Sequence, residues 1–145
     1  MVYCHQKPKH NFRFFREIIM ALQESGEMYL ETIYVLSLES DEVRAIDIGE
    51  HMNYSKPSVS RAMGLLIKDG YITRDKDGFI KLTKSGEKIA KRMYERHTVL
   101  SELLIGIGVD KKTATEDACR VEHYISEKTF NAIKAHIKQH GKSKA

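Results

Sequence analysis

The sequence predicts a mainly α-helical fold with one small β-hairpin near its middle. Apolar residues recur at helical spacing between residues 24 and 70 and again between residues 85 and 139. Between these stretches, two short runs rich in aromatic and β-branched residues flank Asp77 and Gly78, a pair typical of a hairpin turn. The 145 residues therefore divide into helices, a hairpin and further helices, in that order.

The composition limits the class of protein. With 41% hydrophobic and 30% charged residues the chain can bury a modest core, and it has no apolar run near the roughly 18 residues that cross a membrane. Its two cysteines, Cys4 and Cys119, lie in different surroundings, and no secretory signal pattern is present. We therefore expect a protein of the reducing cytoplasm, without disulfides or membrane association. The net charge of +4 permits a polyanionic partner without requiring one.

The N-terminal segment is predicted to form an arm at residues 1–24, followed by a long helix at residues 24–40. In the arm, basic residues accompany Phe12, Phe14 and Phe15. This combination suits either a short helix docked on the body or a basic arm on a phosphate backbone. In the long helix, apolar side chains recur mostly at helical spacing, at Met28, Leu30, Ile33, Tyr34, Leu36 and Leu38.

A second, short helix is expected at residues 45–52, before a polar turn at residues 53–56. Pro57 then suits the first turn of a third helix, because its missing N–H needs no partner there. Gly70 is a residue type favoured just past a helix C-terminus, and it predicts where this helix ends. The predicted inward residues are Ile46, Ile48 and Met52 in the second helix, and Val59, Met63, Leu66 and Ile67 in the third.

The hairpin and the next helix follow directly. Two strands are expected at residues 71–74 and 79–83, around the Asp-Gly turn. Either Thr83 or Ser85 can cap the following helix, which is expected to end near Gly106.

Two further helices are expected at residues 112–126 and 128–139, and the small, charged residues 141–145 are expected to be a disordered tail. Apolar side chains in these C-terminal helices exceed what one small domain needs in its interior. We therefore expect a homodimer, with contacts from Leu103, Leu104, Ile125, Phe130, Ile133 and Ile137.

Two helices around a tight polar turn, followed by a hairpin, have the order of a winged helix-turn-helix, whose second helix enters the major groove of DNA. Hydroxyl groups and helix N-terminal amides suit phosphate oxygens, and Arg61 can reach a phosphate or a guanine edge. The alternative is that small polar residues cap any helix and lysines occur on any hairpin. We predict contacts with double-stranded operator DNA from Ser55, Lys56, Pro57, Ser58, Ser60 and Arg61 on that helix and from Arg74 and Lys76 on the hairpin.

A second group of residues combines thiol, carboxylate and imidazole side chains. Cys119, Glu122 and His123 stand at positions i, i+3 and i+4 and would share one helical face. A divalent cation would offset the cost of burying a carboxylate beside a thiol. Side chains from the first helix and from the helix after the hairpin extend the set of candidate metal ligands to Met28, Glu31, His97, Cys119, Glu122 and His123.

Each candidate ligand alone also has an ordinary structural role. Met28 can pack in a core, Glu31 can be a solvated carboxylate and Cys119 a small buried apolar residue. His97 can be a core histidine with one hydrogen bond. The sequence is therefore also compatible with a winged-helix regulator that responds to an organic effector or to none. An enzyme, namely a thiol hydrolase using Cys119, is not expected, because no glycine-rich elbow or oxyanion-hole pattern accompanies it.

Seven short motifs occur in a distinctive order: EMYLETIY at residues 27–34, SKPSVS at 55–60, KDG at 68–70, LTKSG at 82–86, RH at 96–97, GVD at 108–110 and CRVEH at 119–123. In this order and spacing the chain resembles the diphtheria-toxin-repressor family of metal-dependent transcriptional repressors, over about residues 25–138. The resemblance implies a winged helix-turn-helix, a helical dimerisation domain and metal ligands between them. It also implies that metal orders the first helix and sets two DNA-reading heads at operator spacing.

The resemblance assigns ligands from two branches of the family. The principal regulatory site of iron-type members is matched by Met28, Cys119, Glu122 and His123. Manganese-type members resemble the chain at Glu31 and His97, and they also lack a third, SH3-like domain. Sulfur ligands favour iron, cobalt, nickel or zinc over manganese. We therefore expect a divalent transition metal, Fe(II) in preference to Mn(II), with Zn, Co or Ni able to bind in vitro.

The chain departs from the family pattern at two positions. Ser101 stands where a second-site carboxylate is common, and Thr115 stands where iron-type members have a histidine. The predicted function is a metal-dependent repressor of metal homeostasis, activated for operator binding by Fe(II) or Mn(II). The predicted segments are the arm at residues 1–24, the winged helix-turn-helix DNA-binding domain at 25–92, the metal-binding and dimerisation domain at 93–140 and the tail at 141–145.

Overall fold

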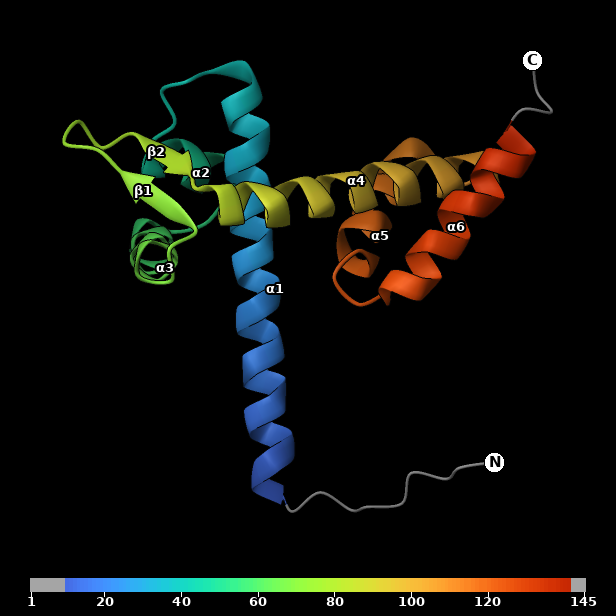
Figure 1. Ribbon diagram of the computed structural model, residues 1–145, viewed down its shortest axis with the longest axis horizontal. Helices are drawn as coiled ribbons and strands as arrows, with labels where there is room; N and C mark the ends of the chain where they lie inside the picture. The colour runs from blue at the N-terminus through green and yellow to red at the C-terminus, as the bar shows by residue number, and fades with distance from the viewer. Residues whose placement is uncertain (1–9, 142–145) are drawn as a thin grey trace.

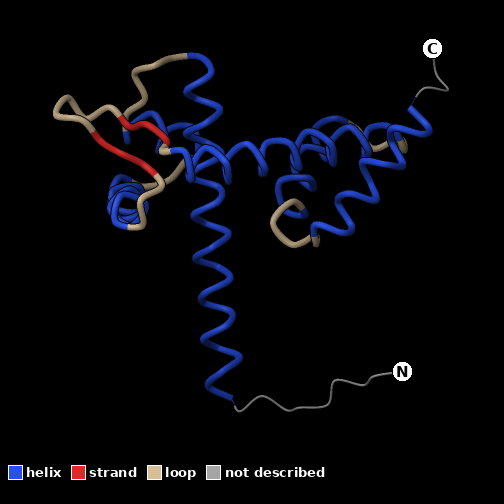
Figure 2. The backbone as a smooth tube through the Cα atoms, viewed as in Figure 1, coloured by secondary structure: helices blue, strands red, loops and turns tan. Residues whose placement is uncertain are grey.

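The computed structural model describes the backbone of residues 10–141 and the side chains of residues 23–141. The described chain is mainly helical and has one two-stranded sheet (Figures 1 and 2). Its elements are α1 (His10–Glu39), α2 (Ala45–Met52), α3 (Lys56–Lys68), β1 (Ile72–Arg74), β2 (Ile80–Leu82), α4 (Lys84–Gly106), α5 (Lys111–Val121) and α6 (Glu127–His140).

Helix α1 is longer than predicted, because it runs without interruption from His10 to Glu39. The predicted start at residue 24 is therefore wrong, and Ser25 and Gly26 lie inside the helix. The first half of α1 continues straight away from the other elements, while its second half passes between the winged helix-turn-helix elements and the C-terminal helices (Figure 1). The predicted docking of the phenylalanines at 12, 14 and 15 lies outside the described side chains.

The second half of α1 closes the core of the helix-turn-helix. Tyr29, Leu30 and Ile33 are buried in one cluster with Ile48 of α2 and with α3 residues that include Met63. Because this apolar face occurs at helical spacing, its burial fixes the rotation of α1 about its own axis. The direction in which the other side chains of α1 point is therefore fixed as well.

Two of the predicted inward residues are wrong. Ile46 is 50% exposed and Ile67 is 40% exposed, whereas Ile48 and Leu66 are buried. Successive helical positions are about 100° apart. A residue two positions before Ile48, or one position after Leu66, therefore lies on another face.

The hairpin forms the predicted wing, with strands shorter than predicted. Its strands are antiparallel, and Ile72 faces Leu82. In the turn, the Asp75 carboxylate accepts hydrogen bonds from the backbone N–H groups of Asp77 and Phe79, both at 2.9 Å. Gly78 has a φ of 85°, which a residue with a β-carbon rarely adopts.

Helix α4 joins the wing to the C-terminal helices. Thr83 caps its start, because the Thr83 hydroxyl accepts from the N–H of Gly86 at 3.2 Å. It crosses α1 and continues over α5 (Figure 1), and its contacts with both helices are extensive. Residues of α1, α4 and α5 therefore meet on one side of α1.

Helix α5 ends earlier than predicted, at Val121 rather than near residue 126. Beyond its end the backbone carbonyls of Glu122 and Ile125 accept hydrogen bonds from Nη1 of Arg96, at 3.0 and 2.8 Å. Nη2 of Arg96 also donates to the Glu127 carboxylate at 2.7 Å. The buried arginine of α4 thus satisfies carbonyl groups that a longer helix would have paired internally.

Candidate metal centre and DNA-binding surface

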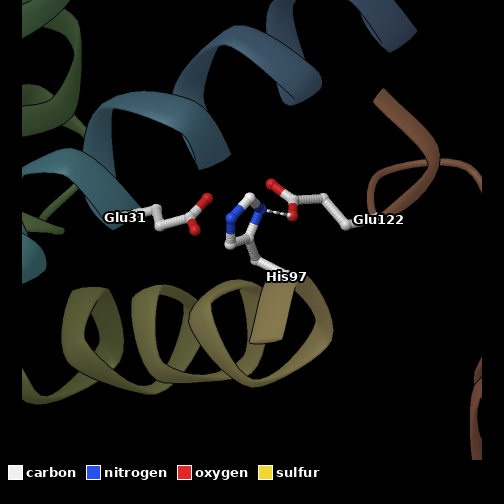
Figure 3. Close-up of side chains that lie close together, drawn as sticks. All are labelled: Glu31, His97 and Glu122. Atoms are coloured by element: carbon white, nitrogen blue, oxygen red, sulfur yellow. Dashed lines mark hydrogen bonds and ion pairs between the residues drawn. The ribbon is translucent and has the colours of Figure 1, made fainter. Parts of the chain in front are cut away.

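Three acidic or imidazole side chains from distant segments converge beside α1. Glu31 comes from α1, His97 from α4 and Glu122 from the C-cap of α5, and they point toward one another (Figure 3). One ligand-type atom from each lies within 4.8 Å of the others. Nδ1 of His97 is 3.0 Å from Oε2 of Glu122, whose side chain is completely buried. Carboxylate and imidazole donors of this kind suit a divalent transition metal.

His123 lies beside the other carboxylate oxygen of Glu122. Its Nδ1 is 2.9 Å from Oε2 of Glu27, and its Nε2 is 3.3 Å from Oε1 of Glu122. Within the described part of the chain, His123 Nε2 and Glu122 Oε1 are buried and have no hydrogen-bond partner. Their separation is short but their alignment does not make a hydrogen bond. Buried unpaired polar atoms are rare in folded proteins, and a nitrogen and an oxygen so placed fit a divalent metal.

The protonation of the cluster reflects its crowded carboxylates. Burial and the neighbouring Glu122 raise the pKa of Glu31 to about 8. Burial alone would lower the pKa of His123, but contacts with Glu122 and Glu27 outweigh it and raise that pKa to about 9. The hydrogen bond with Glu122 also raises the pKa of His97. For Glu122, burial opposes the charged form, yet the histidines hold its pKa below the ordinary value. Protons thus balance charge that a cation could balance instead.

The two sulfur-bearing candidates, Met28 and Cys119, are not part of the converging group of Glu31, His97 and Glu122. Cys119 is a partly buried free thiol that is not among the converging ligand atoms, and Met28 is also partly buried. Burial, followed by the charges of Glu122 and Glu31, raises the pKa of the Cys119 thiol.

The predicted common helical face of Cys119, Glu122 and His123 is corrected by the end of α5. Cys119 lies inside the helix, Glu122 is its C-cap and His123 lies in the following turn. Sequence reasoning also missed Glu27. Its position one helical turn before Glu31 was the available signal, because residues i and i+4 share a face.

The predicted DNA-contacting residues all lie at the surface of the helix-turn-helix and the wing. Ser55 caps α3 by accepting from the Ser58 N–H, and Pro57 lies in the first helical turn. A hollow of about 830 Å³ between α2, the start of α3 and the wing is lined in part by Lys56, Ser60 and Arg74. The exposed residues are Ser55, Lys56, Pro57, Ser58, Ser60, Arg61, Arg74 and Lys76.

Arg44 is a further basic residue on this surface that sequence reasoning missed. Its guanidinium lies 4.6 Å from the centre of the Phe79 ring on the wing, and it lines the same hollow as Arg74. The signal was the position of Arg44 directly before the second helix, but its proximity to the wing depends on the tertiary fold.

Together these features define a class of protein. Helices α1 and α4 connect a helix-turn-helix with a β-hairpin wing to a partly buried cluster of carboxylates and histidines. This combination is expected for a DNA-binding regulator that responds to a metal ion. No helix in the described part of the chain has the length and apolar character needed to cross a bilayer.

Comparisons with known proteins identify the family. Residues 21–79 match the iron dependent repressor N-terminal DNA binding domain, and residues 83–143 match the iron dependent repressor metal binding and dimerisation domain. The chain belongs to this family of metal-dependent transcriptional repressors, which confirms the resemblance to the diphtheria-toxin-repressor family. The prediction that the protein is not an enzyme is likewise confirmed.

Individual relatives are named as manganese regulators or as MntR. The chain is 34% identical to the transcriptional regulator MntR of Salmonella typhimurium over 130 residues, 89% of this chain and 83% of that protein. It is 36% identical to the HTH-type transcriptional regulator MntR of Bacillus subtilis, over 75% of this chain and 77% of that one. The solved structure of the manganese regulator SloR has a TM-score of 0.71 and 26% identity, and the match covers 78% of this chain and 53% of that chain.

Proposed function

We propose that this protein is a homodimeric repressor that binds operator DNA when Fe(II) or Mn(II) occupies the cluster around Glu122. The observation that carries the proposal is the convergence of Glu31, His97 and Glu122 from three separate segments. The ligands are Glu31, His97, Glu122 and His123, with Met28 and Cys119 as flanking sulfur ligands.

The connection from cluster to DNA runs through α1. Glu31 faces the cluster, while Leu30 and Ile33 of the same helix are buried in the helix-turn-helix core. A bound divalent ion would supply the positive charge that neutralises the carboxylates and ties the three segments together. Because the apolar face of α1 is buried against α2 and α3, fixing Glu31 against His97 and Glu122 favours one orientation of the DNA-reading elements. Thermodynamic linkage then requires operator DNA to tighten metal binding by the same factor.

The identity of the metal depends on the sulfur residues. The carboxylates and imidazoles of the cluster suit both Fe(II) and Mn(II), whereas Met28 and Cys119 favour Fe(II) over Mn(II). The names of the relatives point to manganese as the alternative. We propose Fe(II) as the preferred ion, with Zn, Co and Ni able to bind in vitro.

The proposed DNA-binding unit comprises residues 25–92 and the proposed metal-binding and dimerisation unit residues 93–140. In the second unit a hollow lined by Leu103, Ala132 and Ile133 lies between α4 and α6 and offers apolar surface to a second copy of the chain. The proposed DNA contacts are Ser55, Lys56, Pro57, Ser58, Ser60, Arg61, Arg74 and Lys76.

The test is an anaerobic gel shift with duplexes selected from a random pool by the metal-loaded protein. We expect Fe(II) or Mn(II) to increase DNA affinity at least about tenfold, which corresponds to a coupling free energy of about 1.4 kcal/mol. Glu122→Gln should abolish this response. Glu87→Gln is the matched control, because the ion pair of Glu87 within the described residues is with exposed Lys91 on α4. DNA affinity that ignores these metals would favour a regulator with an organic effector or none.

A further inference from the structure

Glu27 connects α1 to His123 across 96 positions of the sequence. Its Oε2 is 2.9 Å from Nδ1 of the imidazole, and the two side chains are 10% and 2% exposed respectively. An acid and an imidazole so deeply buried cannot exchange their contact for water without cost. The pair is therefore a defined part of the fold.

The contact fixes which way the imidazole faces. With Nδ1 held by Glu27, the opposite ring nitrogen Nε2 faces Oε1 of Glu122, 3.3 Å away. Both of these atoms lack a hydrogen-bond partner in the described part of the chain. The ring nitrogen that faces the cluster, Nε2, is thus the one that makes no hydrogen bond within the described residues.

Glu27 is itself held from two helices. Oε1 accepts from Nε2 of Gln23 on α1 at 3.4 Å and lies 3.7 Å from Nη2 of Arg92 on α4. Its neighbour one helical turn later, Glu31, faces the cluster directly. Helix α1 therefore presents two carboxylates on one face, of which one reaches the cluster and the other reaches it through His123.

We propose that Glu27 is a positioning residue of the metal centre, which holds Nδ1 of His123 so that Nε2 is presented to the ion. This inference rests on the proposed function. A carboxylate that accepts from one imidazole nitrogen fixes the tautomer and increases the basicity of the other nitrogen. Glu27 therefore gives α1 a second connection to the segment after α5, in addition to Glu31. The Glu27 side chain makes this connection through His123 and does not contact the ion.

Metal affinity is the first measurement. In calorimetric titrations of the full chain with Mn(II), we expect Glu27→Ala to weaken binding by about 10- to 100-fold, the usual cost of losing such a partner. Glu27→Gln should lose less, because its amide oxygen still accepts a hydrogen bond. The matched control is Glu24→Gln, which removes the same charge from α1 and leaves an amide oxygen that can still accept from exposed Tyr124. We expect it to stay within about threefold of the unmodified protein.

The second measurement is the His123 ring signal in ¹⁵N-histidine NMR spectra of the Zn(II)-loaded protein, since Zn(II) is diamagnetic. A slowly exchanging Nδ1 proton is expected in the unmodified chain and in Glu24→Gln, but not in Glu27→Ala. Unchanged affinity in both folded Glu27 variants, or weaker affinity with the Nδ1 proton retained, overturns the inference. Loss of metal by Glu122→Gln would then leave the proposed function standing, whereas an unmodified chain that binds no Mn(II), Fe(II) or Zn(II) overturns both.

Discussion

His97 and Glu122 come from segments 25 residues apart, and Nδ1 of His97 lies 3.0 Å from Oε2 of the completely buried Glu122. A fully buried carboxylate must be compensated by donors or by a cation. One oxygen of Glu122 is compensated by His97, while the other, Oε1, faces His123 without a hydrogen bond. The hydrogen-bonding capacity of the cluster is therefore only partly met by the described residues. The two unpaired atoms, Glu122 Oε1 and His123 Nε2, suit a metal ion.

The stability of the metal-free protein is expected to fall as pH rises. Glu31 has an ordinary pKa of 4.5 that is raised to about 8, and His123 an ordinary value of 6.5 that is raised to about 9. The folded chain therefore holds more protons than the unfolded chain in this range, so stability decreases with pH. The contribution of His123 is full below pH 6.5 and is lost as pH rises through about 9. The lowered pKa of Glu122 acts only at lower pH and does not oppose this trend.

Thermal unfolding measured in chelator between pH 6 and 9 tests this expectation. The double variant Glu31→Gln with His123→Gln should show a flatter dependence, and Glu87→Gln should follow the unmodified protein. With saturating Mn(II) the fall should also be smaller, because metal binding releases protons and becomes tighter as they dissociate. An unmodified protein with no loss of stability across this range would contradict the assigned protonation.

The sulfur residues are expected to set metal preference. Replacing Met28 and Cys119 by Asp and Glu supplies oxygen donors, which should raise affinity for Mn(II) relative to Fe(II) by on the order of tenfold. Cys119→Ala separates loss of the thiol from gain of a carboxylate. Anaerobic competition titrations measure the ratio, and a thiolate-to-metal absorption band with Co(II) reports the Cys119 contact directly. If the ratio is the same in all variants and the band is absent, sulfur does not select the ion.

The sequence predicted the elements better than the meeting of their side chains. Helical spacing and the Asp-Gly pair located the helices and the wing, because local periodicity and turn chemistry suffice for that. The end of α5 at Val121 was missed, since Arg96 of α4 supplies the hydrogen bonds that end it. Convergence of Glu31, His97 and Glu122 depends on how α4 crosses α1, which no local pattern encodes. The roles of Glu27 and Arg44 depend on the same long-range packing.

Gly86 is expected to tolerate no side chain. A β-carbon at this position would lie 2.0 Å from the carbonyl oxygen of Tyr71, a backbone atom that cannot move aside without disturbing the wing. Gly86→Ala should therefore reduce the free energy of unfolding by roughly 1–3 kcal/mol or more. Gly64→Ala is the matched control, because nothing lies within 4 Å of a β-carbon there and helical alanine is favourable. Chemical denaturation measures both variants, and equal stability would show that the contact is relieved elsewhere.

Arg61 and Lys76 are expected to contribute differently to DNA binding. Arg61 is exposed on α3, where we expect it to contact a base edge. Arg61→Ala should therefore cost about 1–3 kcal/mol and relax specificity at one position of the selected duplex. Lys76 lies on the turn of the wing, where a phosphate contact is expected. Lys76→Ala should weaken binding to all duplexes about equally and reduce the salt dependence by about one released ion.

The exposed Lys138, on α6 and remote from the wing, is the control for total charge. Competition assays with mutated duplexes at several salt concentrations separate the two effects. Equal losses of specificity for both variants would contradict the assignment of α3 to base readout and of the wing to the phosphate backbone.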